Sequence, residues 1–127
     1  MDGAFKNKKV LFVEDDEANR YYTQLILEDI GCAFELVSNG QEAVDKLKAS
    51  KFNIVFTDLR MPVLDGFNLV RIIREKIDKD LVIVAVTANV HHDIADQCAA
   101  NGMNGFIAKG SDVKEFINEL TQWIAKS

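Results

Sequence analysis

Five short apolar runs, each followed by a polar or charged residue, are the feature that most constrains the fold of this chain. The runs cover residues 10–13, 32–37, 52–57, 81–86 and 105–108. They are continuously apolar rather than alternating, which is typical of strands buried on both faces of a parallel sheet. Helical patterns separate them, at residues 18–30, 41–49, 66–76, 91–101 and from 111 onward. The sequence therefore predicts an α/β fold, a five-stranded parallel sheet with helices on both faces.

Apolar spacing and capping residues give the expected detail of four helices. In the first, Ala18, Tyr22, Leu25 and Ile26 recur at helical spacing, and Gly31 provides a stop. Asp65 is the expected N-cap of the third helix, and Ser111 that of the last. In the helix predicted for residues 91–101, Ile94, Ala95, Cys98 and Ala99 are expected to face the core.

Composition limits the domain count and the kinds of partner. A chain of 127 residues predicts one domain, residues 1–127, with its core at about 9–124. The net charge of −5 and the pI of about 5.0 disfavour direct binding to nucleic-acid phosphates or to anionic lipid. No apolar segment approaches the length of a membrane span, so a cytoplasmic protein without membrane contact is expected.

The residues at the carboxyl ends of four runs form a chemically consistent set. Glu14 and Asp15 follow the first run, Asp58 the third, Thr87 the fourth and Lys109 the fifth. In a parallel sheet these ends share one edge, so the side chains are expected to converge. Crowded carboxylates need protonation or a cation, and oxygen ligands completed by waters suit Mg²⁺. An ammonium and a hydroxyl suit phosphoryl oxygens, which makes Asp58 a candidate nucleophile activated by a metal.

These residues also resemble a known family. Glu14-Asp15, the stretch Asp58-Leu59-Arg60-Met61-Pro62-Val63-Leu64-Asp65-Gly66, Thr87-Ala88-Asn89 and Lys109 resemble the receiver domain of two-component response regulators. The resemblance runs from about Lys9 to about Ile124, and within the family the motifs are most similar to those of receivers in hybrid sensor histidine kinases. It implies a flavodoxin-like doubly wound sheet of order 2-1-3-4-5, the order that general accounts of this fold already give for a receiver protein.

The resemblance implies a role for each site residue. Asp58 would be the phosphoacceptor, and Thr87 and Lys109 would bind the phosphoryl oxygens. Glu14, Asp15, Asp58 and the backbone carbonyl of Arg60 would hold Mg²⁺. Thr87 and the aromatic Phe106 would form the conformational switch. The expected partners are a sensor histidine kinase or a histidine phosphotransfer protein on the donor side, and an unidentified output partner.

Gly110 departs from the family pattern. Receivers usually have proline directly after the lysine, in a peptide bond that is usually cis, and this chain has Gly110. A cis bond without proline costs ~3 kcal/mol, which makes trans an alternative here, and the sequence leaves the state of the Lys109–Gly110 bond open.

Three other functions fit parts of the same evidence. A Mg²⁺-dependent phosphatase with an aspartyl nucleophile would use the same carboxylates, but such enzymes usually carry a second acid at the position of Arg60. A flavin or nucleotide carrier would need a glycine- or hydroxyl-rich loop after the first strand, where acids stand instead. A receiver that works without phosphate is favoured only by Gly110. A phosphorylation switch that turns over no small-molecule substrate is therefore the leading hypothesis.

Overall fold

Parallel strands and helices alternate along the chain in the computed structural model, which describes residues 5–61, 63–88, 90–110 and 112–127. The strands are β1 (Lys9–Val13), β2 (Ala33–Val37), β3 (Ile54–Thr57), β4 (Val82–Thr87) and β5 (Gly105–Ala108). The helices are α1 (Glu17–Ile30), α2 (Gly40–Ala49), α3 (Gly66–Ile72), α4 (Ile94–Ala100) and α5 (Val113–Lys126), with a π-helical turn, η1 (Ile73–Ile77), continuing α3. None of the helices in these ranges is both long and apolar enough to cross a bilayer.

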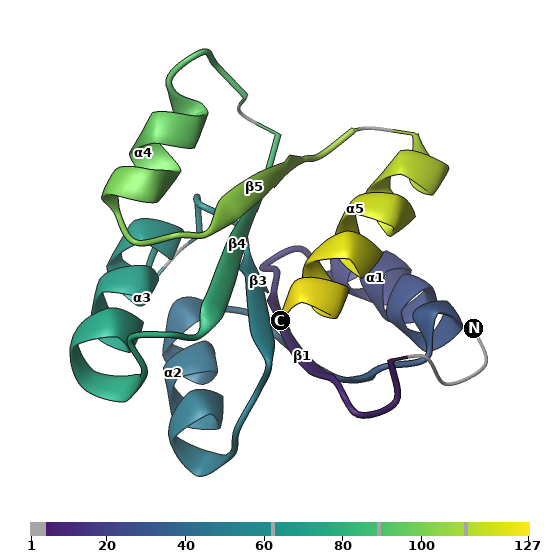
Figure 1. Cartoon of the computed structure of the whole chain (residues 1–127), viewed down its shortest axis with the longest axis horizontal. Coiled ribbons are helices and arrows are strands. Elements are labelled where there is room, and N and C mark those ends of the chain that lie inside the picture. Colours follow the sequence, from purple (N-terminus) through teal and green to yellow (C-terminus); the bar gives the residue numbers. More distant parts are fainter. Residues whose placement is uncertain (1–4, 62, 89, 111) are drawn as a thin grey trace.

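The sheet has the predicted order β2-β1-β3-β4-β5, and every strand pair is parallel. Figure 1 shows α1 and α5 covering one face of the sheet and α2, α3 and α4 covering the other. Because the chain runs outward from β1 in both directions, the strand order reverses between β1 and β3. This reversal is where ligands bind in open parallel sheets. The doubly wound fold predicted from the sequence is confirmed.

The three central strands explain why the apolar runs are continuous. Every residue of β3 is fully buried, and so are nearly all residues of β1 and β4. Their side chains contribute alternately to two cores, one beneath α1 and α5 and one beneath α2, α3 and α4. Burial on both faces removes any need for alternating polar residues. The strands therefore hold their polar groups only at their ends.

The predicted apolar face of α1 is wrong except at Ile26, which is buried. The buried residues of this helix are Thr23, Ile26, Leu27 and Ile30. Tyr22 and Leu25, which were expected on the core face, are 43% and 47% exposed. The predicted set and the buried set both have helical spacing. The buried face is displaced from the predicted face by about one residue along the chain, which is a rotation of about 100° around the helix axis. The aliphatic set occupies the core, and the tyrosine-containing set faces solvent.

Two element boundaries also differ from the prediction. Helix α3 gives way to a π turn at Ile73, where apolar spacing alone predicts a regular helix to residue 76. Helix α4 begins at Ile94 rather than at His91, because residues 91–93 form a turn in which the Ile94 N–H bonds the His91 carbonyl at 3.0 Å. Of its four expected core residues only Ile94 and Cys98 are buried.

Of the two predicted helix caps, the one on α3 is confirmed, whereas α5 is capped by a different residue. Asp65 caps α3 as expected, since its side chain accepts the Asn68 N–H at 2.8 Å. Helix α5 is capped by Asp112, whose carboxylate accepts the Lys114 N–H at 3.2 Å. Ser111, the predicted cap, lies outside the described residues. The Lys109–Gly110 bond, whose state the sequence leaves open, is trans, because the described residues contain no cis peptide bond.

Gly66 allows the loop that carries Asp58 to pack closely against the start of α3. A Cβ at this position would lie 2.5 Å from the Asp58 carbonyl oxygen and 2.9 Å from Leu59 Cα. The Gly66 N–H donates to the Leu59 carbonyl at 3.0 Å, which closes the loop onto the start of α3. The aspartate-glycine pair of the sequence therefore serves both as a helix cap and as the site of a close backbone approach.

We expect Gly66→Ala to lower the free energy of unfolding by about 2–3 kcal/mol, because the added methyl group meets backbone that cannot give way. Gly110→Ala is the matched control. Its methyl group meets open space, and only the φ of 87° is unfavourable, so the expected loss is about 1 kcal/mol. Urea denaturation of both variants measures the difference. A Gly66→Ala variant as stable as the wild-type chain would contradict the close approach.

Candidate functional site

Three carboxylates meet at the carboxyl end of the sheet. Glu14 and Asp15 come directly after β1, and Asp58 comes directly after β3. Strand pairing aligns these ends, since the Asp58 N–H bonds the Val13 carbonyl at 3.3 Å. One oxygen from each of the three acids lies within 4.8 Å of the others. Glu14 is only 2% exposed, while Asp15 is exposed, so the cluster runs from the interior to the surface.

Lys109 lies between the two inner acids. Its ammonium contacts Glu14 Oε1 at 2.7 Å and Asp58 Oδ2 at 2.7 Å. Burial by itself lowers the pKa of Lys109, but the hydrogen bonds and charges of Asp58 and Glu14 outweigh burial and raise that pKa above its ordinary value. One positive charge thus offsets part of two negative charges, and Asp15, the third acid of the cluster, lies at the surface with no salt bridge to a lysine among the described residues.

Backbone groups hold the remaining carboxylate oxygens. Glu14 Oε2 accepts the Asp16 N–H at 3.2 Å, and Asp58 Oδ1 accepts the Arg60 N–H at 3.2 Å. These bonds orient both carboxylates toward Lys109. They also place the backbone of Arg60 beside Asp58, whereas the use of its carbonyl as a metal ligand stays a prediction.

Arg20 has a structural role that sequence reasoning missed. Its guanidinium donates to the carbonyl oxygens of Glu14 and Asp15, both at 2.9 Å, and so reaches back over the turn from β1 into α1. The only sequence signal is its position, one turn into the helix that follows the acids. Asp16 caps α1 by accepting the Asn19 N–H at 2.8 Å, which agrees with its interpretation as a helix-start acid.

Thr87 and Phe106 project from the same face of the sheet. Phe106 pairs in register with Ala85, two positions before Thr87, so the side chains share a side. Thr87 is 3% exposed, and its carbonyl accepts the Lys109 N–H at 2.8 Å. Phe106 is half-buried against the core beneath α2, α3 and α4. The structure thus places both predicted switch residues on one face of the sheet, with Thr87 at the carboxyl end of β4 and Phe106 two register positions further from that end.

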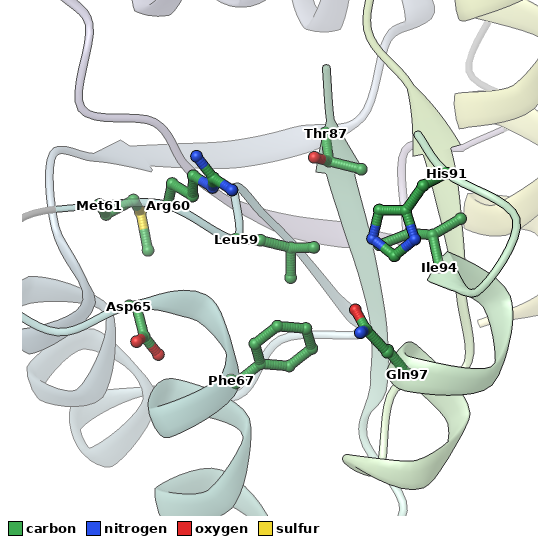
Figure 2. Close-up of a pocket in the computed structure, with 9 residues that line it drawn as sticks. All are labelled: Leu59, Arg60, Met61, Asp65, Phe67, Thr87, His91, Ile94 and Gln97. Atoms are coloured by element: carbon green, nitrogen blue, oxygen red, sulfur yellow. The ribbon is translucent and has the colours of Figure 1, made fainter. Parts of the chain in front are cut away.

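A pocket of about 720 Å³ opens on the Thr87 side of the cluster. Its lining comes from the loop after β3, the start of α3, the end of β4, and α4 with the turn before it. The lining residues are Leu59, Arg60, Met61, Asp65, Phe67, Thr87, His91, Ile94 and Gln97. Figure 2 shows the side chains of His91 and Gln97 facing Leu59 and Phe67 across this space. Open space therefore adjoins the predicted switch on the face from which Thr87 and Phe106 project.

The loop after Asp58 contains a strained residue. Val63 has a φ of 73°, and it is the one non-glycine residue with positive φ in the described part of the chain. The left-handed conformation costs an L-residue about 1–2 kcal/mol, and a β-branched side chain makes it rarer still. Val63 is 80% exposed, so packing recovers little of that cost.

A family model described as the response regulator receiver domain matches residues 10–121. The chain belongs to this family. Hybrid signal transduction histidine kinase A of Dictyostelium discoideum is 35% identical over 121 residues, which cover 91% of this chain and 6% of that protein. The chain thus corresponds to a small part of this relative, and as a receiver domain it is a module of two-component signalling.

Solved receiver structures share the fold. The receiver domain of sensor histidine kinase PA1611 from Pseudomonas aeruginosa PAO1, with a magnesium ion coordinated in its active site cleft, is 32% identical with a TM-score of 0.80. The two chains align over 93% of this one and 98% of that one. The Saccharomyces cerevisiae Ssk1 receiver domain, co-crystallised with the histidine phosphotransfer signaling protein Ypd1, is 26% identical with a TM-score of 0.83, over 96% and 92% of the chains.

The donor set of the cluster fits a hard divalent cation. Three carboxylates supply oxygen ligands, and the exposure of Asp15 leaves room for waters to complete an octahedron. Lys109 already neutralises part of this charge. A divalent cation held by these acids would therefore add to the partial neutralisation that Lys109 already provides.

We expect Lys109→Met to lower the free energy of unfolding by about 2 kcal/mol without divalent cations, because Glu14 and Asp58 lose their shared counter-charge. Addition of MgCl₂ should restore more stability to this variant than to the wild-type chain. Urea denaturation at several Mg²⁺ concentrations measures both effects. Arg20→Met is the control, because its loss removes bonds to backbone carbonyls and should respond less to Mg²⁺. Equal Mg²⁺ responses in all three proteins would contradict this account of the charges.

Proposed function

We propose that Asp58 is the phosphoacceptor of this receiver domain, and that it takes a phosphoryl group from a phosphohistidine on a partner protein. The observation that carries the proposal is the bridge from Lys109 to Asp58 and Glu14, with Asp15 in the same cluster. It supplies a nucleophile, a cation for the transferred oxygens and a divalent-cation site in one place.

Transfer exchanges one phosphorus bond for another. An oxygen of Asp58 forms a bond to phosphorus while the N–P bond of the phosphohistidine breaks, and the electron pair of that bond returns to the imidazole. Lys109 holds Asp58 Oδ2 before transfer, and its mobile ammonium then follows the charge onto a phosphoryl oxygen. Thr87 offers its hydroxyl to another phosphoryl oxygen.

Magnesium is the proposed cofactor. Glu14, Asp15, Asp58 and the Arg60 carbonyl would hold it, with Asp15 the leading direct carboxylate ligand of the acidic pair. A bound Mg²⁺ would neutralise charge on the transferring phosphoryl group. The carboxylate cluster and the magnesium ion in the PA1611 receiver support this assignment.

The proposed phosphodonor is a sensor histidine kinase or a histidine phosphotransfer protein. The similarity to a hybrid histidine kinase and the Ssk1–Ypd1 complex support a donor of this class. The net charge of −5 makes direct output through nucleic acid unfavourable. Output therefore passes through a further protein contact.

Thr87 and Phe106 are the proposed switch. When Thr87 moves toward the phosphoryl group, space opens on the face that it shares with Phe106, and the half-buried aromatic ring turns inward. The equilibrium between the two arrangements then depends on the phosphoryl group. The pocket beside Thr87 supports this proposal, because it adjoins the space into which these side chains would move.

Intact-mass spectrometry after incubation with acetyl phosphate and Mg²⁺ tests the phosphoacceptor. One added phosphoryl group is expected in the wild-type chain and none in Asp58→Asn. Asp65→Asn is the matched control, since asparagine keeps a capping oxygen for the Asn68 N–H and the adduct should form as in the wild-type chain. No adduct with donor and metal present would refute the proposal. Steady hydrolysis of phosphomonoesters would favour a phosphatase instead.

A further inference from the structure

The pocket beside Thr87 has a buried and mostly apolar floor. Leu59, Ile94 and Thr87 are the buried part of its lining. Phe67 and Met61 are half-buried, and they add an aromatic ring and a thioether. The volume, about 720 Å³, is typical of sites that hold small organic molecules. The pocket therefore has both the size and the apolar surface that such a molecule needs.

Arg60 and Gln97 bring polar side chains to this pocket that the fold itself does not use. Their backbone N–H groups are bonded to Asp58 and Asp93. Among the described residues, however, neither the Arg60 guanidinium nor the Gln97 side-chain amide has a hydrogen-bond or ion-pair partner. Figure 2 shows the tips of these two side chains at opposite ends of the space, with Leu59 between them. A ligand that lies along the floor can therefore meet a polar group at each end.

His91 adds a further donor to the lining. Its Nδ1 accepts the Asp93 N–H at 3.3 Å, so the neutral imidazole carries its hydrogen on Nε2. The acid in the lining, Asp65, is engaged as the cap of α3, where it accepts the Asn68 N–H. The guanidinium, the imidazole and the side-chain amide can all donate, and this set suits a ligand that is rich in acceptor oxygens.

Charge and shape narrow the class of ligand. A guanidinium binds a carboxylate through two parallel hydrogen bonds. The lining has one arginine, and Asp58 lies two residues before it, so a phosphate dianion would meet the acid cluster without enough compensating charge. The ring of Phe67 and the aliphatic side chains of Leu59 and Ile94 favour a flat apolar body. An aromatic monocarboxylate satisfies both requirements.

We propose that this pocket binds an aromatic carboxylate, and that the bound ligand holds the receiver in its unphosphorylated arrangement. The carboxylate pairs with Arg60, and the ring lies on Leu59 beside Phe67. Gln97 and His91 donate to a polar substituent at the far end of the ring. The regulatory part of the proposal rests on the proposed function, because what the ligand opposes is phosphoryl transfer.

Ligand binding and phosphorylation oppose each other for two reasons. The Arg60 N–H bonds Asp58 Oδ1 at 3.2 Å, so the residue that pairs with the ligand is bonded to the phosphoacceptor, and the two added negative charges repel. The ligand also takes the open space that adjoins Thr87, a member of the proposed switch. By thermodynamic linkage, each event weakens the other by the same factor.

Isothermal titration calorimetry tests the site with p-coumarate, which has a carboxylate at one end of its ring and a hydroxyl at the other. We expect it to bind the wild-type chain with a Kd of about 0.1–1 mM, as for a ligand of this size. Its neutral counterpart, p-coumaramide, should bind about tenfold more weakly, because it cannot form a charged pair with the guanidinium.

Variants of the lining test the assigned contacts. Arg60→Met removes the cation and Gln97→Glu adds a like charge, so each should raise the Kd for p-coumarate about tenfold. Both residues are exposed, so the melting temperatures should stay at the wild-type value. Gln122→Glu is the matched control, because it makes the same exchange at an exposed position of α5, on the other face of the sheet. Its Kd should equal that of the wild-type chain.

Titration in the presence of Mg²⁺ and beryllofluoride, a phosphoryl mimic, tests the regulation. The mimic should raise the Kd for p-coumarate about tenfold, and saturating p-coumarate should raise the Kd for the mimic by the same factor. Absence of p-coumarate binding, or equal affinities in the wild-type chain and both lining variants, would overturn the site. Binding that the mimic leaves unchanged would overturn the regulation. A chain that binds p-coumarate but takes no label from acetyl phosphate in its absence would refute the proposed function, and the regulation with it, while confirming the site.

Discussion

The contact of one ammonium with two carboxylates is the interaction on which the rest of the site depends. Glu14 is almost fully buried and Asp58 is partly buried, and Lys109 lies within 2.7 Å of both. Two negative charges held so close repel each other strongly in a medium of low dielectric. The Lys109 ammonium offsets part of this repulsion and links the two acids. Lys109 follows β5, the last strand, so the whole sheet must form before this lysine lies beside Glu14 and Asp58.

The sheet makes this contact possible through its order. Because β1 lies between β2 and β3, the acids after β1 and β3 become neighbours although they are far apart in sequence. Lys109 reaches them from the end of β5, across the end of β4. Short loops then hold each group in place. Arg20 bonds the Glu14 carbonyl in the turn after β1, and Gly66 packs closely against the Asp58 carbonyl in the loop after β3. Parallel pairing and close backbone packing therefore place the site.

Much of the fold was predictable because burial on both sheet faces leaves a strong signal in sequence. The continuous apolar runs marked all five strands, and the polar residues after them marked the edge that carries the site. Single helix faces were less predictable. The set with Tyr22 and Leu25 has the same spacing as the buried set with Leu27, so periodicity could not choose between them. Nor could it show the π turn at Ile73 or the late start of α4, which depend on local backbone bonds. Glu14, Asp58 and Lys109 were predicted as site residues from the sequence. Their direct contact could be recognised only from the interatomic distances in the structure.

The structure of this chain with Mg²⁺ and beryllofluoride, a phosphoryl mimic, tests the central claim most directly. The account predicts the beryllium on an oxygen of Asp58, the metal between Asp15 and Asp58, and the Lys109 ammonium moved from Asp58 onto a fluoride. A complex in which Asp58 carries no adduct, or in which Lys109 still bridges Asp58 and Glu14 beside the bound mimic, would contradict it.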